Sequence, residues 1–458
     1  MIAVEGRPIL TAAEMRAAEI AAMTADVTVD TLMARAGGAV ATAVRRLAAG
    51  GPVLVLCGPG NNGGDGYIAA ARLKAAGVPV RVAASAAPGS DAFRTAAAGW
   101  DGPVEALGDV APAPVLVDAL FGTGLSRPID DAVATRLRDL AAAARLTIAV
   151  DLPSGVSTDD GAVLSLPPVF DVVLALGAVK PAHVLQPAAR YARSVRLLDI
   201  GVAMDSDAAV LDRPSLPTPG PDAQKYTRGM VAVVAGSMAG AAELASVAAM
   251  RAGAGYVLLL GKTAGPPHAL VRKPLDAKTI GDTRIGALLV GPGLGRDDEA
   301  RAKLDLAFAS GRLMVIDGDA LHLVDPARIA ARAPGAILTP HGGEFDALFG
   351  KSDADKIART RDAARRSGAV VVFKGADTVI ASPTGRVCVA GGTSDWLSTA
   401  GTGDVLAGTI AATRASGMTP FDAACAGVWL HGEAARRAGP AFIADDLADA
   451  LTAARASL

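Results

Sequence analysis

VLVLCGPGNNGGDGYIAAARL, residues 53–73, passes from an apolar run through a glycine-rich turn into a stretch with helical periodicity. A buried strand followed by such a turn and a helix is the repeating unit of parallel α/β sheets. Gly58, Gly60 and Gly63 match the G-x-G-x-x-G pattern that brings backbone close to a pyrophosphate in dinucleotide-binding folds. The stretch therefore predicts an α/β fold, and its asparagines and aspartate require a further explanation.

The same alternation of strand-like and helix-like segments continues along the 458 residues, a length that favours two domains. Hydrophobic residues make up 51% of the chain but aromatic residues only 3%, as helix layers on a parallel sheet allow. A proline-rich stretch, DRPSLPTPGPDAQKY at 212–226, interrupts the pattern. We expect a doubly wound domain over residues 1–210, a linker over 211–225 and a second α/β domain over 226–458.

Charge and cysteine usage exclude several classes of partner. The formal net charge is −2 with acids and bases interspersed, which gives no electrostatic footprint for nucleic acid or an anionic membrane. Neither a signal peptide nor an apolar run long enough for a membrane helix is recognisable. Cys57, Cys388 and Cys425 lie far apart without a C-x-x-C pair. We expect a cytoplasmic protein with a small-molecule partner, and the pattern leaves open whether it forms a homo-oligomer.

Polar residues follow expected strands in the first half, where ligands of open parallel sheets bind. Asp118 and Asp151 end two of these strands, and Ser154 follows in the next turn. Residues 66–90 contain no acidic residue, so the ribose-binding acid that a dinucleotide cofactor needs about 20 residues after its glycine loop is missing. The oxygens of Asn62, Asp118 and Ser154 instead suit a hard cation, although such residues also stabilise turns or cap helices.

Four motifs of the first half, GPGNNGGDG, DALFGTGLSRP, DLPSGV and GAVKP, resemble in order and spacing the epimerase domain of the bifunctional NAD(P)H-hydrate repair enzymes. The resemblance implies a Rossmann-like domain in which Asn62, Asp118 and Ser154 surround a potassium ion and Asp151 is the catalytic acid or base. Lys180, in GAVKP, matches a family position whose role stays open. The hydrated nicotinamide nucleotide would be bound by Asn61, Asn62, Gly63, Gly64, Asp65, Gly122, Thr123, Gly124, Leu125, Ser126, Arg127, Pro128 and Asp151.

LSTAGTGDVLAGTIAAT, residues 397–413, carries the strongest functional signal of the second half. Gly401 and Thr402 lead into an expected helix whose first-turn N–H groups would face an anion. Asp404 lies in the same turn, where a carboxylate can accept the proton of an attacking hydroxyl. Glycine turns followed by aspartate are common, but the chain contains no G-x-x-x-x-G-K-[ST] sequence, so a Walker-type nucleotide site is not the explanation.

Five motifs of the second half, KYTRGMVAVVAGSMAGAAELA, GPGLG, TPHGGEF, VVFKGADTVI and AGTGDVLAG, resemble the ribokinase-like dehydratase domain of the same enzymes. The resemblance covers about residues 222–455 and implies that Asp404 is the catalytic base. A lone histidine after a strand is usually structural, but its place in TPHGGEF favours a substrate role. The hydrated nucleotide would be bound by Ala241, Gly293, Gly295, His341 and Asp404. The adenine nucleotide would be bound by Lys374, Gly375, Ala376, Asp377, Thr378 and Gly403.

The resemblance implies that this chain repairs the hydrates of NADH and NADPH, called NADHX and NADPHX. The first domain would interconvert their R and S forms. The second would phosphorylate the S form with ADP or ATP, assisted by Mg²⁺, and eliminate phosphate. Two alternatives are a ribokinase-like small-molecule kinase with a regulatory first domain, and a first domain that has become a binding module. The retained Asp151, with Asn62, Asp118 and Ser154, argues against the binding module.

Overall fold

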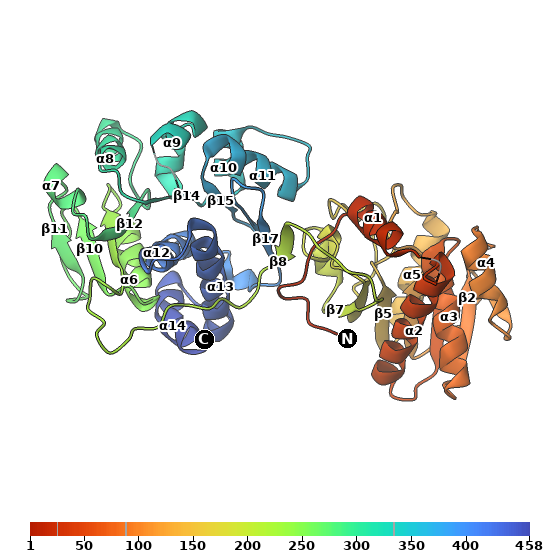
Figure 1. Ribbon diagram of the computed structural model, residues 1–458. Coiled ribbons are helices and arrows are strands. Elements are labelled where there is room, and N and C mark those ends of the chain that lie inside the picture. Colours follow the sequence, from red (N-terminus) through yellow and green to blue (C-terminus); the bar gives the residue numbers. More distant parts are fainter. Residues whose placement is uncertain (25, 88, 333–334) are drawn as a thin grey trace. The chain divides into compact units, whose positions relative to one another are not determined.

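The computed structural model describes residues 1–24, 26–87, 89–332 and 335–458. These residues form two compact units, Met1–Val210 and Leu211–Leu458, each built of a sheet and its covering helices (Figure 1). The α/β class expected from the sequence is confirmed in both units. No helix in the described part of the chain is both long enough and apolar enough to cross a membrane.

The first unit is a parallel sheet of order β3-β2-β1-β4-β5-β6-β7. The order runs outward in both directions from β1 and β4, which is the doubly wound arrangement. The strands of this unit are β1 (Val53–Cys57), β2 (Val80–Ala84), β3 (Val104–Ala106), β4 (Val115–Ala119), β5 (Leu146–Val150), β6 (Val172–Leu176), β7 (Val195–Leu198) and β8 (Ala208–Val210). The helices are α1 (Ala12–Ala22), α2 (Val29–Ala48), α3 (Asn61–Ala75), α4 (Asp91–Ala98) and α5 (Asp131–Ala143).

Alternate residues of β1 belong to different cores, because successive side chains of a strand point to opposite faces. Val53 and Val55 pack in a cluster that includes residues of α2 and α3. Leu54 and Leu56 pack with residues of α5. Both faces of the sheet are therefore covered, and the binding edge is left to the loops that follow the strands.

The glycine-rich segment differs from the sequence expectation, because it is helical from Asn61 onward. A Cβ on Gly63 would lie 2.1 Å from the carbonyl oxygen of Gly58, and one on Gly64 would lie 2.6 Å from Sδ of Met33. These glycines therefore allow the first turns of α3 to approach β1 and α2 closely. Packing explains why a helix begins with residues of low helix propensity.

The second unit is a mixed sheet of order β11-β10-β9-β12-β13-β14-β15-β16-β17, parallel up to β15 and antiparallel beyond it. The strands are β9 (Met230–Val234), β10 (Tyr256–Leu260), β11 (Val271–Lys273), β12 (Ile285–Val290), β13 (Met314–Ile316), β14 (Ile337–Leu338), β15 (Val370–Phe373), β16 (Thr378–Ala381) and β17 (Val387–Ala390). The helices are α6 (Ala239–Arg251), α7 (Ala277–Ile280), α8 (Asp298–Ala309), α9 (Pro326–Arg332), α10 (Gly342–Phe349), α11 (Lys356–Ser367), α12 (Thr402–Ala415), α13 (Pro420–Ala438) and α14 (Ala444–Ala456).

Several short strands have no clear signal in the sequence. β3 and β11 are three residues long, and both contain charged side chains, such as Glu105 and Arg272. Such residues are tolerated because these strands lie at the edges of their sheets. The helix that the sequence predicts after Gly401 and Thr402 is confirmed as α12.

Candidate active sites

A cavity of about 630 Å³ in the first unit is lined by three separate segments of the predicted substrate site. They are the start of α3, the glycine turn after β4 and Asp151 after β5. The predicted residues on its wall are Asn61, Asn62, Asp65, Gly122, Thr123, Gly124, Leu125, Ser126, Arg127 and Asp151. Gly63 and Gly64 are buried in the packing of α3, and these two and Pro128 are not on the wall.

The carboxylate of Asp151 accepts hydrogen bonds on both oxygens. Its Oδ2 accepts from the backbone N–H of Thr123 at 3.0 Å and from the Thr123 hydroxyl at 2.5 Å. Its Oδ1 accepts from Nζ of Lys180 at 2.6 Å. Asp151 also has a φ of 65°, a left-handed conformation that non-glycine residues seldom adopt. The site thus holds this side chain in one orientation at the expense of backbone strain.

Lys180 and Asp151 form a buried ion pair, with side chains only 1% and 7% exposed. Burial raises the pKa of Asp151, but attraction and hydrogen bonding by Lys180 outweigh it and lower that pKa to about 2. Nζ of Lys180 also donates to the carbonyl oxygen of Leu176 at 2.6 Å. Asp151 is therefore a carboxylate at neutral pH, and the structure shows Lys180 to be its cationic partner.

The side chain of His183 forms hydrogen bonds with the backbone of both Lys180 and Asp151. The backbone N–H of Lys180 donates to Nδ1 of His183 at 2.8 Å, so the ring proton must lie on Nε2. Nε2 then donates to the carbonyl oxygen of Asp151 at 2.6 Å. Burial and the nearby Lys180 lower the pKa of His183 to about 4, so the ring is neutral at physiological pH. This histidine has no recognisable motif of its own, so no pattern in the sequence indicates its role.

Two further carboxyl groups line the same cavity, Asp65 on α3 and Glu19 on α1. Asp65 is 8% exposed, and burial followed by repulsion from Asp151 raises its pKa well above the ordinary value. Burial also raises the pKa of Glu19. The cavity therefore combines an ionised carboxylate of lowered pKa with a carboxyl group whose pKa is raised.

Asp118 and Ser154 are brought together directly behind the cavity. The Ser154 hydroxyl donates to Oδ1 of Asp118 at 2.7 Å, and the Ser154 N–H donates to Oδ2 at 3.0 Å. The side-chain nitrogen of Asn62 is buried without a hydrogen-bond acceptor among the described residues. Its carbonyl oxygen lies 3.0 Å from the position a Cβ on Gly122 would occupy. The three predicted cation ligands thus come from β4, from the turn after β5 and from α3.

In the second unit, Gly401 places the first turn of α12. It has a φ of 87°, and a Cβ there would approach Leu244 Cδ2 within 2.8 Å and Ala444 Cβ within 2.9 Å. The Thr402 hydroxyl donates to the carbonyl oxygen of Leu397 at 2.9 Å. This first turn, which contains Asp404, is thereby fixed against the preceding segment. First-turn N–H groups of a helix are of the kind that can bind an anion.

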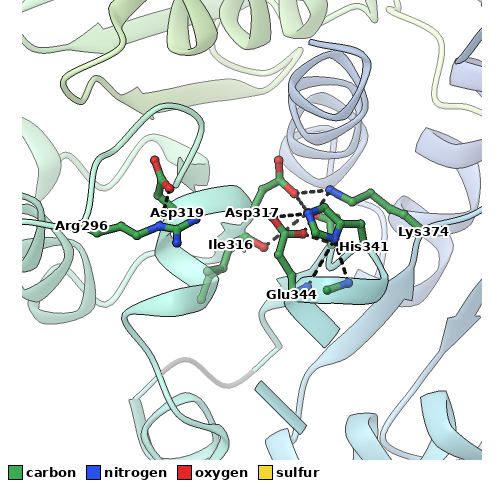
Figure 2. Close-up of polar contacts among 9 residues, drawn as sticks. Arg296, Ile316, Asp317, Asp319, His341, Glu344 and Lys374 are labelled. Atoms are coloured by element: carbon green, nitrogen blue, oxygen red, sulfur yellow. Dashed lines mark hydrogen bonds and ion pairs between the residues drawn. The ribbon is translucent and has the colours of Figure 1, made fainter. Parts of the chain in front are cut away.

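Lys374, at the end of β15, is paired with a carboxylate that the sequence analysis did not name. Figure 2 shows its Nζ directed at Asp317, with a separation of 2.8 Å from Oδ1. Glu344 Oε2 is 3.8 Å from the same nitrogen. Asp317 follows β13 and is 2% exposed, and its Oδ1 also accepts from the Thr339 hydroxyl at 2.6 Å. A strand ending in aspartate was the available signal for this residue.

Asp404 lies close to Lys374 and Asp317, and the nearer carboxylate partner of Lys374 is Asp317. Burial, and then repulsion by Asp317, raise the pKa of Asp404 to about 7, although attraction by Lys374 opposes them. A Cβ on Gly403 would lie 3.5 Å from Nζ of Lys374, so the predicted nucleotide residues Gly403 and Lys374 are neighbours. Asp404 can therefore accept a proton near neutral pH.

The remaining predicted substrate residues of the second unit lie in the loops after β12 and β14 and at the start of α6. Gly295 N–H donates to Oδ2 of Asp319 at 3.0 Å, and Arg296 pairs with Oδ1 of that carboxylate at 2.9 Å (Figure 2). A Cβ on Gly293 would touch Ala241 Cβ at 3.0 Å. His341 caps α10, because its Nδ1 accepts from the backbone N–H groups of residues 343 and 344.

The predicted adenine-nucleotide segment follows β15 and is supported by Lys356. This lysine pairs with Asp377 at 2.5 Å and lies over the ring of Phe373 at 4.5 Å. A Cβ on Gly375 would come within 2.6 Å of Nζ of Lys356, so a side chain there would displace the end of this lysine. Thr378 closes the turn by donating to the Gly375 carbonyl oxygen at 2.9 Å. Ala376 lies within this turn.

Comparisons with known proteins match both units. Residues 29–182 match the family described as YjeF-related protein N-terminus, and residues 231–455 match the family described as NAD(P)H-hydrate dehydratase. The bifunctional NAD(P)H-hydrate repair enzyme Nnr of Thermofilum pendens is 35% identical over 450 residues, covering 88% of this chain and 86% of the relative. The chain belongs to the bifunctional NAD(P)H-hydrate repair enzymes.

Two further proteins are similar to this chain. The enzyme of the same name from Escherichia coli K12 is 30% identical, covering 83% of this chain and 80% of the relative. A solved ADP/ATP-dependent NAD(P)H-hydrate dehydratase from Bacillus subtilis, co-crystallised with ATP and Mg²⁺, is 27% identical with a TM-score of 0.47 and covers 52% of this chain and 93% of its own. The fold class and the NAD(P)H-hydrate repair function expected from the sequence, with epimerase and dehydratase domains, are confirmed.

Proposed function

We propose that residues 1–210 epimerise NADHX and NADPHX, that residues 211–225 are a linker and that residues 226–458 dehydrate the S form. One observation carries the epimerase assignment: the segments around Asn61 and Gly122 and the carboxylate of Asp151 line one cavity, together with Lys180. Its volume of about 630 Å³ lies within the range of roughly 300–1,000 Å³ that small-molecule sites occupy.

Asp151 is the proposed acid or base of the epimerisation. The hydroxyl carbon is bonded to the ring nitrogen, so it inverts through an open-ring or iminium-like intermediate once a proton is taken from one atom and another is returned elsewhere. The low pKa of Asp151 keeps it ionised and therefore able to accept a proton, and burial raises the pKa of Asp65, which favours that group as the proton donor of the pair. Two carboxyl groups with oppositely shifted pKa values are the usual basis for such a division of roles.

Asn62, Asp118 and Ser154 are the proposed potassium ligands. The buried, unpaired amide nitrogen of Asn62 supports this, because exchanging the nitrogen and oxygen of the amide would leave a carbonyl oxygen at that buried position instead. An oxygen with no other partner is suited to a hard cation. The bound ion would supply positive charge for the anionic part of the substrate.

In the second unit, Asp404 is the proposed base that takes the proton of the S hydrate's ring hydroxyl. The hydroxyl oxygen then bonds to the terminal phosphorus of the nucleotide, and the bond from that phosphorus to its bridging oxygen breaks. Phosphate later leaves the ring with the electron pair of the C–O bond, and the adjacent ring carbon loses a proton to solvent, so that its C–H electron pair forms the ring double bond. Lys374 and the first turn of α12 would stabilise the phosphoryl oxygens. ADP is the proposed donor, with ATP as the alternative, and the product with ADP would be AMP.

Mg²⁺ is proposed to arrive with the nucleotide. Among the described residues no group of three or more histidine, cysteine, aspartate or glutamate side chains is arranged to hold a metal ion. Mg²⁺ commonly uses one or two carboxylates together with substrate phosphates, so a preformed cage is not required. The ion would neutralise phosphate charge while Lys374 and the α12 N–H groups orient the nucleotide.

The cytoplasm is the proposed location, supported by the three free cysteines, Cys57, Cys388 and Cys425. Cys57 itself is fully buried, and burial raises the pKa of its thiol, as expected for an unreactive core residue. The proposed partners are NADHX, NADPHX and the adenine nucleotide. Assembly into a homo-oligomer is an open proposal that sedimentation would test.

A single assay tests both activities. A mixture of R and S hydrate is incubated with the full chain, ADP or ATP, and Mg²⁺, while the absorbance of the reduced nicotinamide is followed. Complete recovery is expected. Asp151→Ala should leave the R fraction unconverted apart from its slow spontaneous epimerisation, and Asp404→Ala should stop recovery while chromatography still shows R and S interconverting. Recovery of the S form alone by the unmodified chain would refute the epimerase assignment.

A further inference from the structure

A second cavity, of about 260 Å³, lies in the Leu211–Leu458 unit away from the residues of the proposed dehydratase site. It is lined by the part of the proline-rich segment 212–226 from Pro217 onward, by the residues that follow α6 and by the end of α12. Arg228 and Arg455 both line it. The cavity thus has two cationic walls and no role in the proposed reaction.

The two guanidinium groups converge on one glycine. A Cβ on Gly253 would lie 2.7 Å from Nε of Arg455, and Nη2 of Arg228 is 3.4 Å from the Gly253 carbonyl oxygen. Gly253 has a φ of 112°, so the turn after α6 both requires glycine and leaves room for Arg455. Arg455 also donates to the carbonyl oxygen of Pro217 at 2.9 Å, which fixes its orientation.

This pair of like charges has no compensating acid. Neither Arg228 nor Arg455 forms an ion pair with a carboxylate in the described part of the chain, whereas nearby Arg251 pairs with Asp449 at 2.9 Å. Burial and repulsion by Arg228 lower the pKa of Arg455. Each guanidinium has five N–H donors, and the hydrogen bonds described above use only one on each.

We propose that this cavity binds a small oxyanion of the phosphate class between Arg228 and Arg455. Paired guanidinium forks match the geometry of phosphate oxygens, and an anion there would relieve the repulsion between the two arginines. The volume exceeds the roughly 30 Å³ share of one water molecule several-fold. It is also smaller than the roughly 300–1,000 Å³ pockets that enclose larger ligands, so the size favours a phosphate group over a complete dinucleotide.

Position gives such binding a structural consequence. Ala412 and Ser416, at the end of α12, line the cavity, and the first turn of that helix contains Asp404. An anion bound there would hold the segment around Pro217 against α6 and α12. The site is therefore expected to stabilise the second unit whether or not the proposed reaction is taking place.

Isothermal titration of the full chain with inorganic phosphate, pyrophosphate and ribose 5-phosphate, at constant ionic strength, tests the proposal. We expect saturable binding of at least one of these probes. Arg228→Ala and Arg455→Gln should each weaken it about tenfold to a hundredfold, as the loss of a charge-assisted hydrogen bond implies. Tighter binding of ribose 5-phosphate than of the inorganic anions would identify the ligand as a phosphate ester, and the reverse order would identify a free anion.

Arg213→Ala is the matched control. Arg213 lies in the same proline-rich segment and contacts the carbonyl oxygen of Ser457, but it does not line the cavity. Its replacement should leave binding unchanged. Arg228 is exposed, so its replacement should not prevent folding. The proposal is overturned if no probe binds, or if binding is the same in the Arg228 and Arg455 variants, because the anion would then occupy another place such as the nucleotide site.

Discussion

The two proposed catalytic aspartates differ in charge although each has a lysine nearby. Nζ of Lys180 lies 2.6 Å from Oδ1 of Asp151, and the pKa of Asp151 is about 2. Asp404 has Lys374 in its surroundings, but Lys374 pairs with Asp317 at 2.8 Å, and the pKa of Asp404 is about 7. The protonation state of a buried acid is therefore decided by which carboxylate the lysine pairs with, and proximity of a lysine alone does not predict it.

The largest expected effect comes from removing Lys180, which pairs directly with Asp151. Lys180→Met leaves the buried carboxylate of Asp151 without its cation, which should destabilise the first unit by about 3–5 kcal/mol. Urea denaturation followed by circular dichroism measures this change. Adding Asp151→Asn to the same chain removes the unpaired charge and should restore much of the lost stability. Equal stability of the single and double variants would show that the ion pair is not what holds this site.

The two reactions should differ in their dependence on pH. Dehydration requires Asp404 as a carboxylate, so its rate should fall about tenfold per unit as the pH drops below about 7. Epimerisation should lack this fall between pH 5 and 8, because Asp151 remains ionised down to a pH of about 2. Separate assays of each activity across that range, with the S hydrate for dehydration, measure the difference. Parallel profiles would contradict the contrast between the two acids.

Neutralising Asp317, the carboxylate that pairs with Lys374, should make the second site resemble the first. Asp317→Asn removes the largest charge repulsion on Asp404 and frees Lys374, so the midpoint of the dehydration profile should move to lower pH by about one unit, equivalent to about 1.4 kcal/mol. Asp319→Asn is the control, since Asp319 pairs with Arg296 and contributes less repulsion. A larger shift for Asp319→Asn than for Asp317→Asn would refute this ordering.

The last expected effect concerns stability and involves the backbone that presents Asp404. Gly401→Ala forces a side chain into a left-handed position and against Leu244, which should cost about 1–2 kcal/mol for the conformation and more for the contact. Gly417→Ala is the matched control, because Gly417 also has a positive φ of 96° but has no atom within 4 Å of a Cβ there. Thermal unfolding should therefore show a larger loss for Gly401→Ala.

The sequence predicted most of the fold because buried parallel strands are apolar throughout, as in β1 and β9. It did not predict edge strands such as β11, where charged residues are tolerated. The family resemblance likewise predicted most of the residues that line the first cavity, although Gly63, Gly64 and Pro128 are not on its wall. The sequence could not predict that Lys374 pairs with Asp317. This pairing depends on how strand ends that are far apart in the sequence meet in space.

In the first turns of α3, the glycines and the polar residues of one motif have different roles. Gly63 and Gly64 set how near the helix axis comes to β1 and α2, whereas Asn61, Asn62 and Asp65 face the cavity. Ligand chemistry at this edge can therefore be altered without changing the distance between helix and sheet. A scaffold with such a division can exchange one bound nucleotide for another through a few side chains, while the glycine spacing that identifies the motif is retained for packing.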